Sequence, residues 1–180
     1  NTAGQAKVRQ LFVKGDRLHV SDAHTGATRV SINGQPGFVE AQGMSIKGRA
    51  IELEKQTNRL WIDGAGQLVL PVTQDMDGKP LPRPQTLTVD WKQSMNFQLA
   101  TAVFTGNVVA RSSQQVVNTE ILEATLSRPI DFSKPDLQAS QPGERLDLAS
   151  IRTRGWTMLE GRQLDEQGQQ TSFSQMGVND

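Results

Sequence analysis

Residues 100–127 read ATAVFTGNVVARSSQQVVNTEILEATLS, and this stretch decides the fold class. Two runs in which apolar and polar side chains alternate flank a polar turn. Alternation with a period of two puts one face of a β-strand against a core and the other face in water. Apart from scattered hydroxyls and two glutamates, the stretch has no ready nucleophile or metal ligand. It therefore predicts two strands that pack against a core and carry no reactive group.

The same alternation continues elsewhere in the chain. The segment LTVDWKQSMNFQL (87–99) places its apolar residues on odd positions, and only Gln93 interrupts them. One face is thus apolar over the whole segment, as in a long half-buried strand. No window of twelve residues keeps the spacing of apolar residues that an amphipathic helix requires. The chain is predicted to be all-β, mostly antiparallel and without a significant helix.

Glycines mark the places where these strands change direction. In RLWIDGAGQLVL (59–70) one apolar phase is held across Gly64 and Gly66, which predicts a bent strand or a tight hairpin. The apolar phase changes between Ile46 and Ile51. A bulge or tight turn at Gly48 would exchange the two faces of the strand and explain that change.

A short unit recurs, in which a glycine precedes an alternating strand. The glycines at 43, 64 and 106 follow a period of about 21 residues, close to one strand–turn–strand unit. Such units can stack, so that a core grows by addition. We expect one elongated domain over 1–180, with loops where proline, glycine and polar residues collect. The predicted repeats are approximately 8–71, 86–134 and 148–180, and the predicted loops are 73–86 and 133–147.

Composition excludes several classes of function. The chain has 19 basic and 19 acidic residues, so it has no net positive field to hold nucleic acid or an anionic membrane. No apolar run approaches the ~20 residues of a membrane span, and the start carries no signal segment. Cysteine is absent, which excludes disulfides, zinc–thiolate clusters and thiol catalysis.

Three short motifs contain possible metal or phosphate ligands, but each is more typical of a turn. HVSDAH (19–24) gathers two histidines and an aspartate, but on an extended strand His19 and Asp22 point to opposite faces. DMDG (75–78) resembles the start of a calcium loop and lacks the later ligands. DGAG (63–66) precedes a strand, whereas a phosphate cradle requires a helix. We therefore predict no metal, no cofactor and no enzymatic activity.

The segment AVFTGNVVARSSQQVVNTEILEATL (102–126) resembles the repeat of the OstA-like, or lipopolysaccharide-transport protein A-like, family. Segments 39–71 and 149–178 look like a second copy and half of a third. The matching positions of the first copy are Phe104, Gly106, Asn107, Val108, Leu122, Ala124 and Leu126.

This resemblance implies an open, V-shaped β-jellyroll of stacked strands in the periplasm of the Gram-negative cell envelope. It also implies that lipopolysaccharide or another amphipathic lipid places its acyl chains in an apolar groove. The present chain departs from the short bridge protein of the family by its two loops, and it reads as a segment truncated at both ends. The fold is therefore expected to carry over better than the ligand.

The alternating residues supply candidates for the lining of that groove. The same side chains could instead meet one another as a dry core, and the chain could then be a structural or protein-interaction module of the envelope without a lipid. The predicted lining residues are Leu60, Ile62, Leu68, Leu70, Val89, Trp91, Met95, Phe97, Phe104, Val108 and Leu122.

An open stack of strands also has two unpaired edges. They are expected near QLFVKGDRLHV (10–20) and TSFSQMGV (171–178), neither of which contains proline. These edges predict association with other β-jellyroll modules by strand pairing.

Overall fold

The computed structural model describes residues 12–41, 44–74, 80–132, 148–164 and 170–179, and within these ranges it contains twelve strands and no helix. The all-β prediction is confirmed. No helix in the described part of the chain is long and apolar enough to cross a membrane. The strands are β1 (Phe12–Lys14), β2 (Arg17–Ser21), β3 (Arg29–Ala41), β4 (Met44–Glu54), β5 (Arg59–Asp63), β6 (Gly66–Gln74), β7 (Pro80–Trp91), β8 (Ser94–Gln98), β9 (Thr101–Arg111), β10 (Gln115–Leu126), β11 (Leu148–Leu164) and β12 (Gln170–Val178).

Every strand pairing in the described residues is antiparallel. The pairings close a six-stranded barrel in the order β4–β5–β8–β9–β7–β6. On one side of this barrel β3 pairs with β4, and β1 and β2 pair with β3. On the other side β10, β11 and β12 follow β9 in order. The sheet order thus ends at β1 and β12, where the sequence predicted the two edges.

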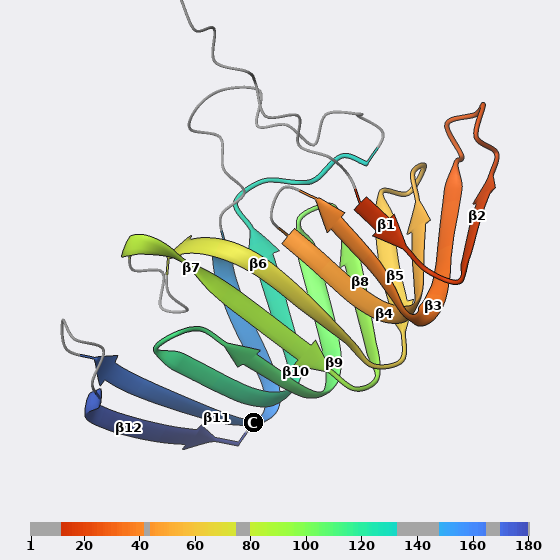
Figure 1. Cartoon of the computed structure of the whole chain (residues 1–180). Helices are drawn as coiled ribbons and strands as arrows, with labels where there is room; N and C mark the ends of the chain where they lie inside the picture. Colours follow the sequence, from red (N-terminus) through yellow and green to blue (C-terminus); the bar gives the residue numbers. More distant parts are fainter. Residues whose placement is uncertain (1–11, 42–43, 75–79, 133–147, 165–169, 180) are drawn as a thin grey trace, which may run out of the picture.

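The barrel is built from strands that bend. Both β5 and β6 pair antiparallel with β4, so the chain runs in one direction through both, and the predicted bent strand over 59–70 is confirmed. In the same way β7 and β8 both pair antiparallel with β9. The bends divide the molecule into a β6–β7 layer and a β5–β8 layer, each containing one half of β4 and of β9. Figure 1 shows the two layers meeting along the lower edge of the view.

Glycines with left-handed backbone conformation lie at these bends. Gly64, Gly106 and Gly155 have φ angles of +92°, +82° and +79°, which residues with a Cβ rarely adopt. The main chain stays hydrogen-bonded through the bend, because the amide of Gly64 donates to the carbonyl of Gln93 at 2.6 Å. In β4 the buried face changes near Gly48, as predicted, opposite a register shift in β3.

The predicted loop over 73–86 is wrong over most of its length. β6 continues to Gln74, β7 begins at Pro80, and Thr86 lies opposite Pro71 in the ladder. The prolines at 80, 82 and 84 alternate, so their missing N–H groups all lie on one side of the strand. In the described residues β7 pairs with β9 only over Thr88–Asp90, which leaves that proline stretch on an edge. The second predicted loop, 133–147, lies outside the described residues.

Candidate functional site

The structure brings all eleven predicted lining residues into one apolar cluster between the two layers, which we call the interior. Leu68 and Leu70 are half-buried. The other nine are buried, with at most 9 % of each residue exposed: Leu60, Ile62, Val89, Trp91, Met95, Phe97, Phe104, Val108 and Leu122.

Strand register aligns these side chains. Residues directly opposite each other in a ladder point to the same face of a sheet. In the β5–β8 layer one such row crosses four strands, through the pairs Ile62↔Met95, Met95↔Phe104 and Phe104↔Leu122. In the β6–β7 layer Leu68 lies opposite Val89, which in turn lies opposite Ala110. Each layer therefore turns a continuous apolar face toward the interior.

Next to the bend, protein side chains fill the interior. The rings of Trp91 and Phe104 lie 5.2 Å apart between centroids, and both residues are almost completely buried. The indole N–H of Trp91 donates a hydrogen bond of 3.0 Å to the carbonyl of Gly64, which satisfies its one polar group. This contact joins the two layers at the corner.

At other places the interior is bordered by side chains that are only partly buried. Leu68 and Leu70 of β6, Leu126 of β10, and Ile151 and Leu159 of β11 pack against the core while remaining partly exposed. We call these five residues the margin of the interior. The margin is apolar surface in direct continuity with the core.

A short segment, 127–132, closes the interior near Phe97. The Asn58 side chain holds it: the amide nitrogen donates to the carbonyl of Ile130, and the amide oxygen accepts from the N–H of Phe132 at 2.7 Å. Ile130 is buried, and the ring of Phe132 meets that of Phe97 edge to face, 5.9 Å between centroids. The N–H of Ile130 donates to the carbonyl of Leu99 at 2.8 Å.

The sequence did not predict the contact between Asn58 and the segment 127–132, nor all residues of the core. Nothing local in the sequence links Asn58 to a segment seventy residues away. Several core residues lay in recognised alternating runs but were not assigned to the lining. The buried apolar residues outside the predicted set are Ile32, Ile46, Ile51, Val72, Leu87, Ala102, Ala110, Val117, Ile130 and Leu148.

Within the residues described, no group of three or more His, Cys, Asp or Glu side chains could hold a metal ion. His19 lies on the exposed strand β2, and Asp22 begins the turn that follows, where its carbonyl accepts from the amide of Thr25 at 3.0 Å. The fold and its interior define an antiparallel β protein with a large apolar cluster between two layers. No protein-family model matches the chain, and no curated protein is significantly similar to it in sequence.

Proposed function

We propose that this chain is a lipid-binding module of the cell envelope, and that its interior receives the acyl chains of lipopolysaccharide or another amphipathic lipid. In this proposal the two layers, which meet at the bends of the six-stranded barrel, are the arms of a V-shaped β-jellyroll of the OstA-like kind. The observation that carries it is the margin, where apolar side chains continuous with the core remain partly exposed.

The chemistry of the margin suits an acyl chain. All five margin residues are aliphatic, so a bound hydrocarbon would meet no polar group that needs a partner. Each methylene group that leaves water contributes about 0.8 kcal/mol. An acyl chain lying along the margin would remove from water both its own surface and the apolar surface of the margin. The resemblance of residues 102–126 to OstA-like repeats supports a periplasmic location for such a module.

The alternation along β6 supplies a matched test of this proposal. Leu70 packs against the core, whereas Gln67 lies on the opposite face and hydrogen-bonds Asp90. A photoreactive phenylalanine analogue at position 70 should crosslink to a myristoyl lysophospholipid, and the same analogue at position 67 should not. Equal crosslinking at the two positions, or none at position 70 in folded protein, would contradict lipid binding in the interior.

A second candidate function, that of an interaction module, rests on a separate observation. Nearly all large apolar side chains that are exposed in the described residues lie on the strands at the two ends of the stack. They are Phe12, Leu18 and Val20 on β1 and β2, and Trp156, Phe173, Met176 and Val178 on β11 and β12. Surfaces of this kind are typical of sites of association.

Replacing Phe173, which is 50 % exposed, by Lys should weaken self-association of the chain. The control is Leu99→Lys, because Leu99 is similarly exposed but lies in the turn before β9. Sedimentation velocity over a range of concentrations measures the effect. A wild-type chain that stays monomeric at the highest concentration, or equal effects of both variants, would count against the interaction module.

A further inference from the structure

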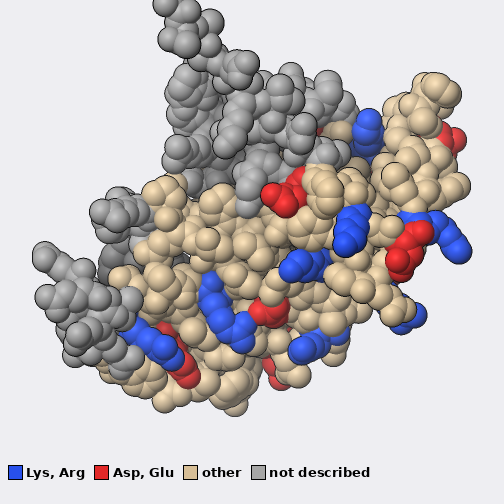
Figure 2. All heavy atoms as spheres, viewed as in Figure 1, with Lys and Arg blue, Asp and Glu red and all other residues tan. Residues whose placement is uncertain are grey.

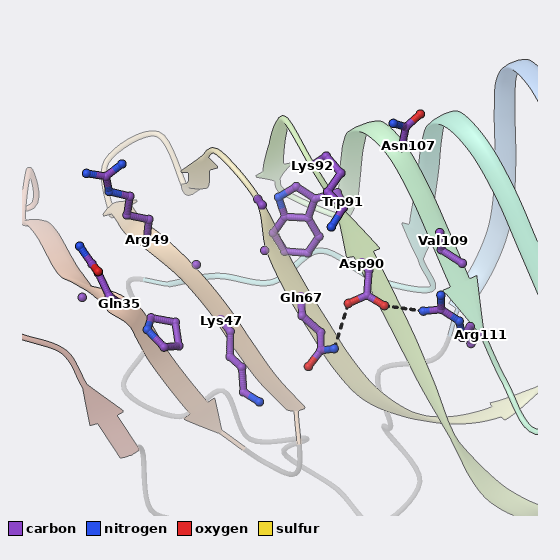
Figure 3. Close-up of a pocket in the computed structure, with 15 residues that line it drawn as sticks. Gln35, Lys47, Arg49, Gln67, Asp90, Trp91, Lys92, Asn107, Val109 and Arg111 are labelled. Atoms are coloured by element: carbon purple, nitrogen blue, oxygen red, sulfur yellow. Dashed lines mark hydrogen bonds and ion pairs between the residues drawn. The ribbon is translucent and has the colours of Figure 1, made fainter.

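The outer surface of the β6–β7 layer carries a hollow that the proposed function does not use. It has a volume of about 800 Å³ and is formed by β3, β4, β6, β7 and β9 around their bends (Figure 3). Side chains alternate along these strands, so that Lys47 and Gln67 line the hollow while Ile46 and Leu68 pack inside. The hollow and the interior thus lie on opposite faces of one layer.

Positive charge dominates this outer hollow. Its lining includes Lys47, Arg49, Lys92 and Arg111, against the single carboxylate of Asp90. Asp90 is already engaged, because it accepts from the Arg111 guanidinium at 2.6 Å and from the Gln67 amide at 2.9 Å (Figure 3). In Figure 2, Lys and Arg side chains extend across the middle of this face of the molecule.

The other cations of the outer hollow form no ion pair with a residue that the structure describes. Among the described residues, Arg49 and Lys92 form no ion pair, and the Lys47 ammonium lies 5.9 Å from the centre of the Phe38 ring. A smaller hollow of about 380 Å³ adjoins the first and shares Gly34, Gln35 and Arg49 with it. Its lining adds one cation, Arg17, and one carboxylate, Asp16. Figure 3 shows Arg49, Lys92 and Arg111 spread along the hollow and not around one point, an arrangement suited to an extended ligand with several charges.

Side-chain amides complete the lining. Gln35 and Asn107 are exposed in the hollow, and Gln67 donates to Asp90 through its amide nitrogen. Amides donate and accept hydrogen bonds, as the hydroxyl groups of a sugar do. Arginine and lysine supply the partners of carboxylates and phosphates. Cations interspersed with amides are the combination that an acidic sugar chain requires.

Two other extended anions fit this surface less well. Proteins hold single-stranded nucleic acid through aromatic rings on which its bases stack. Among the residues that line the hollow only Trp91 is aromatic, and it is 1 % exposed, so its ring cannot stack on a base. An acidic peptide that adds a strand needs an unpaired sheet edge. Here β4 lies between β3 and β6, and β6 between β4 and β7, so these two strands offer the hollow a sheet face and no edge.

We propose that the outer hollow binds an anionic glycan, with Arg49, Lys92 and Lys47 contacting its acidic groups and Gln35, Gln67 and Asn107 its hydroxyls. This site is separate from the interior, so the chain would hold a sugar chain on one face of the layer and a hydrocarbon on the other. Attraction between exposed charges weakens with salt, so the affinity should fall as ionic strength rises.

The test is calorimetric titration of the whole chain with a galacturonic acid hexamer. The double variant Arg49→Glu, Lys92→Glu should lose at least about tenfold in affinity, which corresponds to ~1.4 kcal/mol. The control carries the same change of charge outside both hollows, at exposed Lys14 and Arg152, and should bind within about twofold of the unmodified chain. Circular dichroism of each variant verifies the fold.

Several outcomes would overturn the proposal. They are no binding of the hexamer by the unmodified chain, equal losses in the two double variants, and equally tight binding of a neutral maltohexaose. Equally tight binding of a polyglutamate peptide would assign the surface to acidic proteins instead. Crosslinking of lipid from position 70 is independent of all of these, so failure of the glycan site and failure of the lipid site remain distinguishable.

Discussion

Gly66 has no room for a side chain, because the two layers pack against each other at this point of the bend. A Cβ built there would lie 2.3 Å from Cζ2 of Trp91 and 2.6 Å from the carbonyl oxygen of Lys47. The indole cannot move aside freely, since its N–H is bonded to Gly64 and its ring lies against Phe104. One added methyl group at this corner should therefore strongly change the free energy of unfolding.

We expect Gly66→Ala to lower the free energy of unfolding by about 1–3 kcal/mol through overpacking. Urea denaturation followed by tryptophan fluorescence measures the change. The control is Gly26→Ala, because a Cβ at Gly26 would have no atom within 4 Å and the backbone there is not left-handed. If both variants unfold at the same urea concentration, the corner packs more loosely than the contacts indicate.

The Asn58 side chain is one of the attachments of the segment 127–132. Asn58 has a φ of +52°, so a replacement without Cβ keeps its backbone conformation while removing both amide hydrogen bonds. Asn58→Gly should therefore release Ile130 and Phe132 while the strands remain paired. The loss of the two bonds should cost about 1–3 kcal/mol locally.

Hydrogen exchange of the amides of Ile130 and Phe132 measures this release. We expect faster exchange at these two positions and unchanged exchange at Phe104, which is fully buried in β9. Uniformly faster exchange would mean that Asn58 stabilises the whole domain. Unchanged exchange at Ile130 would mean that the Asn58 hydrogen bonds do not stabilise the segment 127–132. Under the lipid proposal the released segment also exposes Phe97 to a ligand.

Strands and bends could be predicted where the pattern was local. The apolar phase held across Gly64 and its reversal at Gly48 both follow from side-chain alternation, and the structure has a bent strand and a change of face at these places. The prolines at 80, 82 and 84 misled because their spacing of two, which a strand edge tolerates, was read as a loop. The spacing of the prolines was therefore a better indicator of secondary structure than their number.

The interior could be predicted in its residues but not in its closure. Alternation identifies which side chains of a strand face inward, and all eleven predicted residues lie in the apolar cluster. It does not tell how two layers approach each other, nor that Asn58 would bind a segment distant in sequence. The outer hollow could not be predicted for the same reason, since Arg49, Lys92 and Arg111 are far apart in sequence and line one surface only in the folded chain.

Along the stack, burial falls from the middle toward both ends. Ile62, Phe104 and Leu122 in the central strands are fully buried, whereas Phe12 on β1 and Met176 on β12 are more than half exposed. A core that grows by addition has this profile, because each strand is covered by its neighbours. The centre therefore provides stability. Under the two proposed functions, the margin is the surface for lipid and the ends are the surfaces for partners.

Native mass spectrometry can show whether a lipid binds in the interior. The chain is purified without detergent, mixed with a myristoyl lysophospholipid, and compared with a Leu70→Lys variant that places a charge at the margin. We expect a one-to-one lipid complex for the unmodified chain and a much weaker one for the variant. A spectrum that shows only the unbound mass of folded, unmodified chain at saturating lipid, or equal complexes for both proteins, would contradict it.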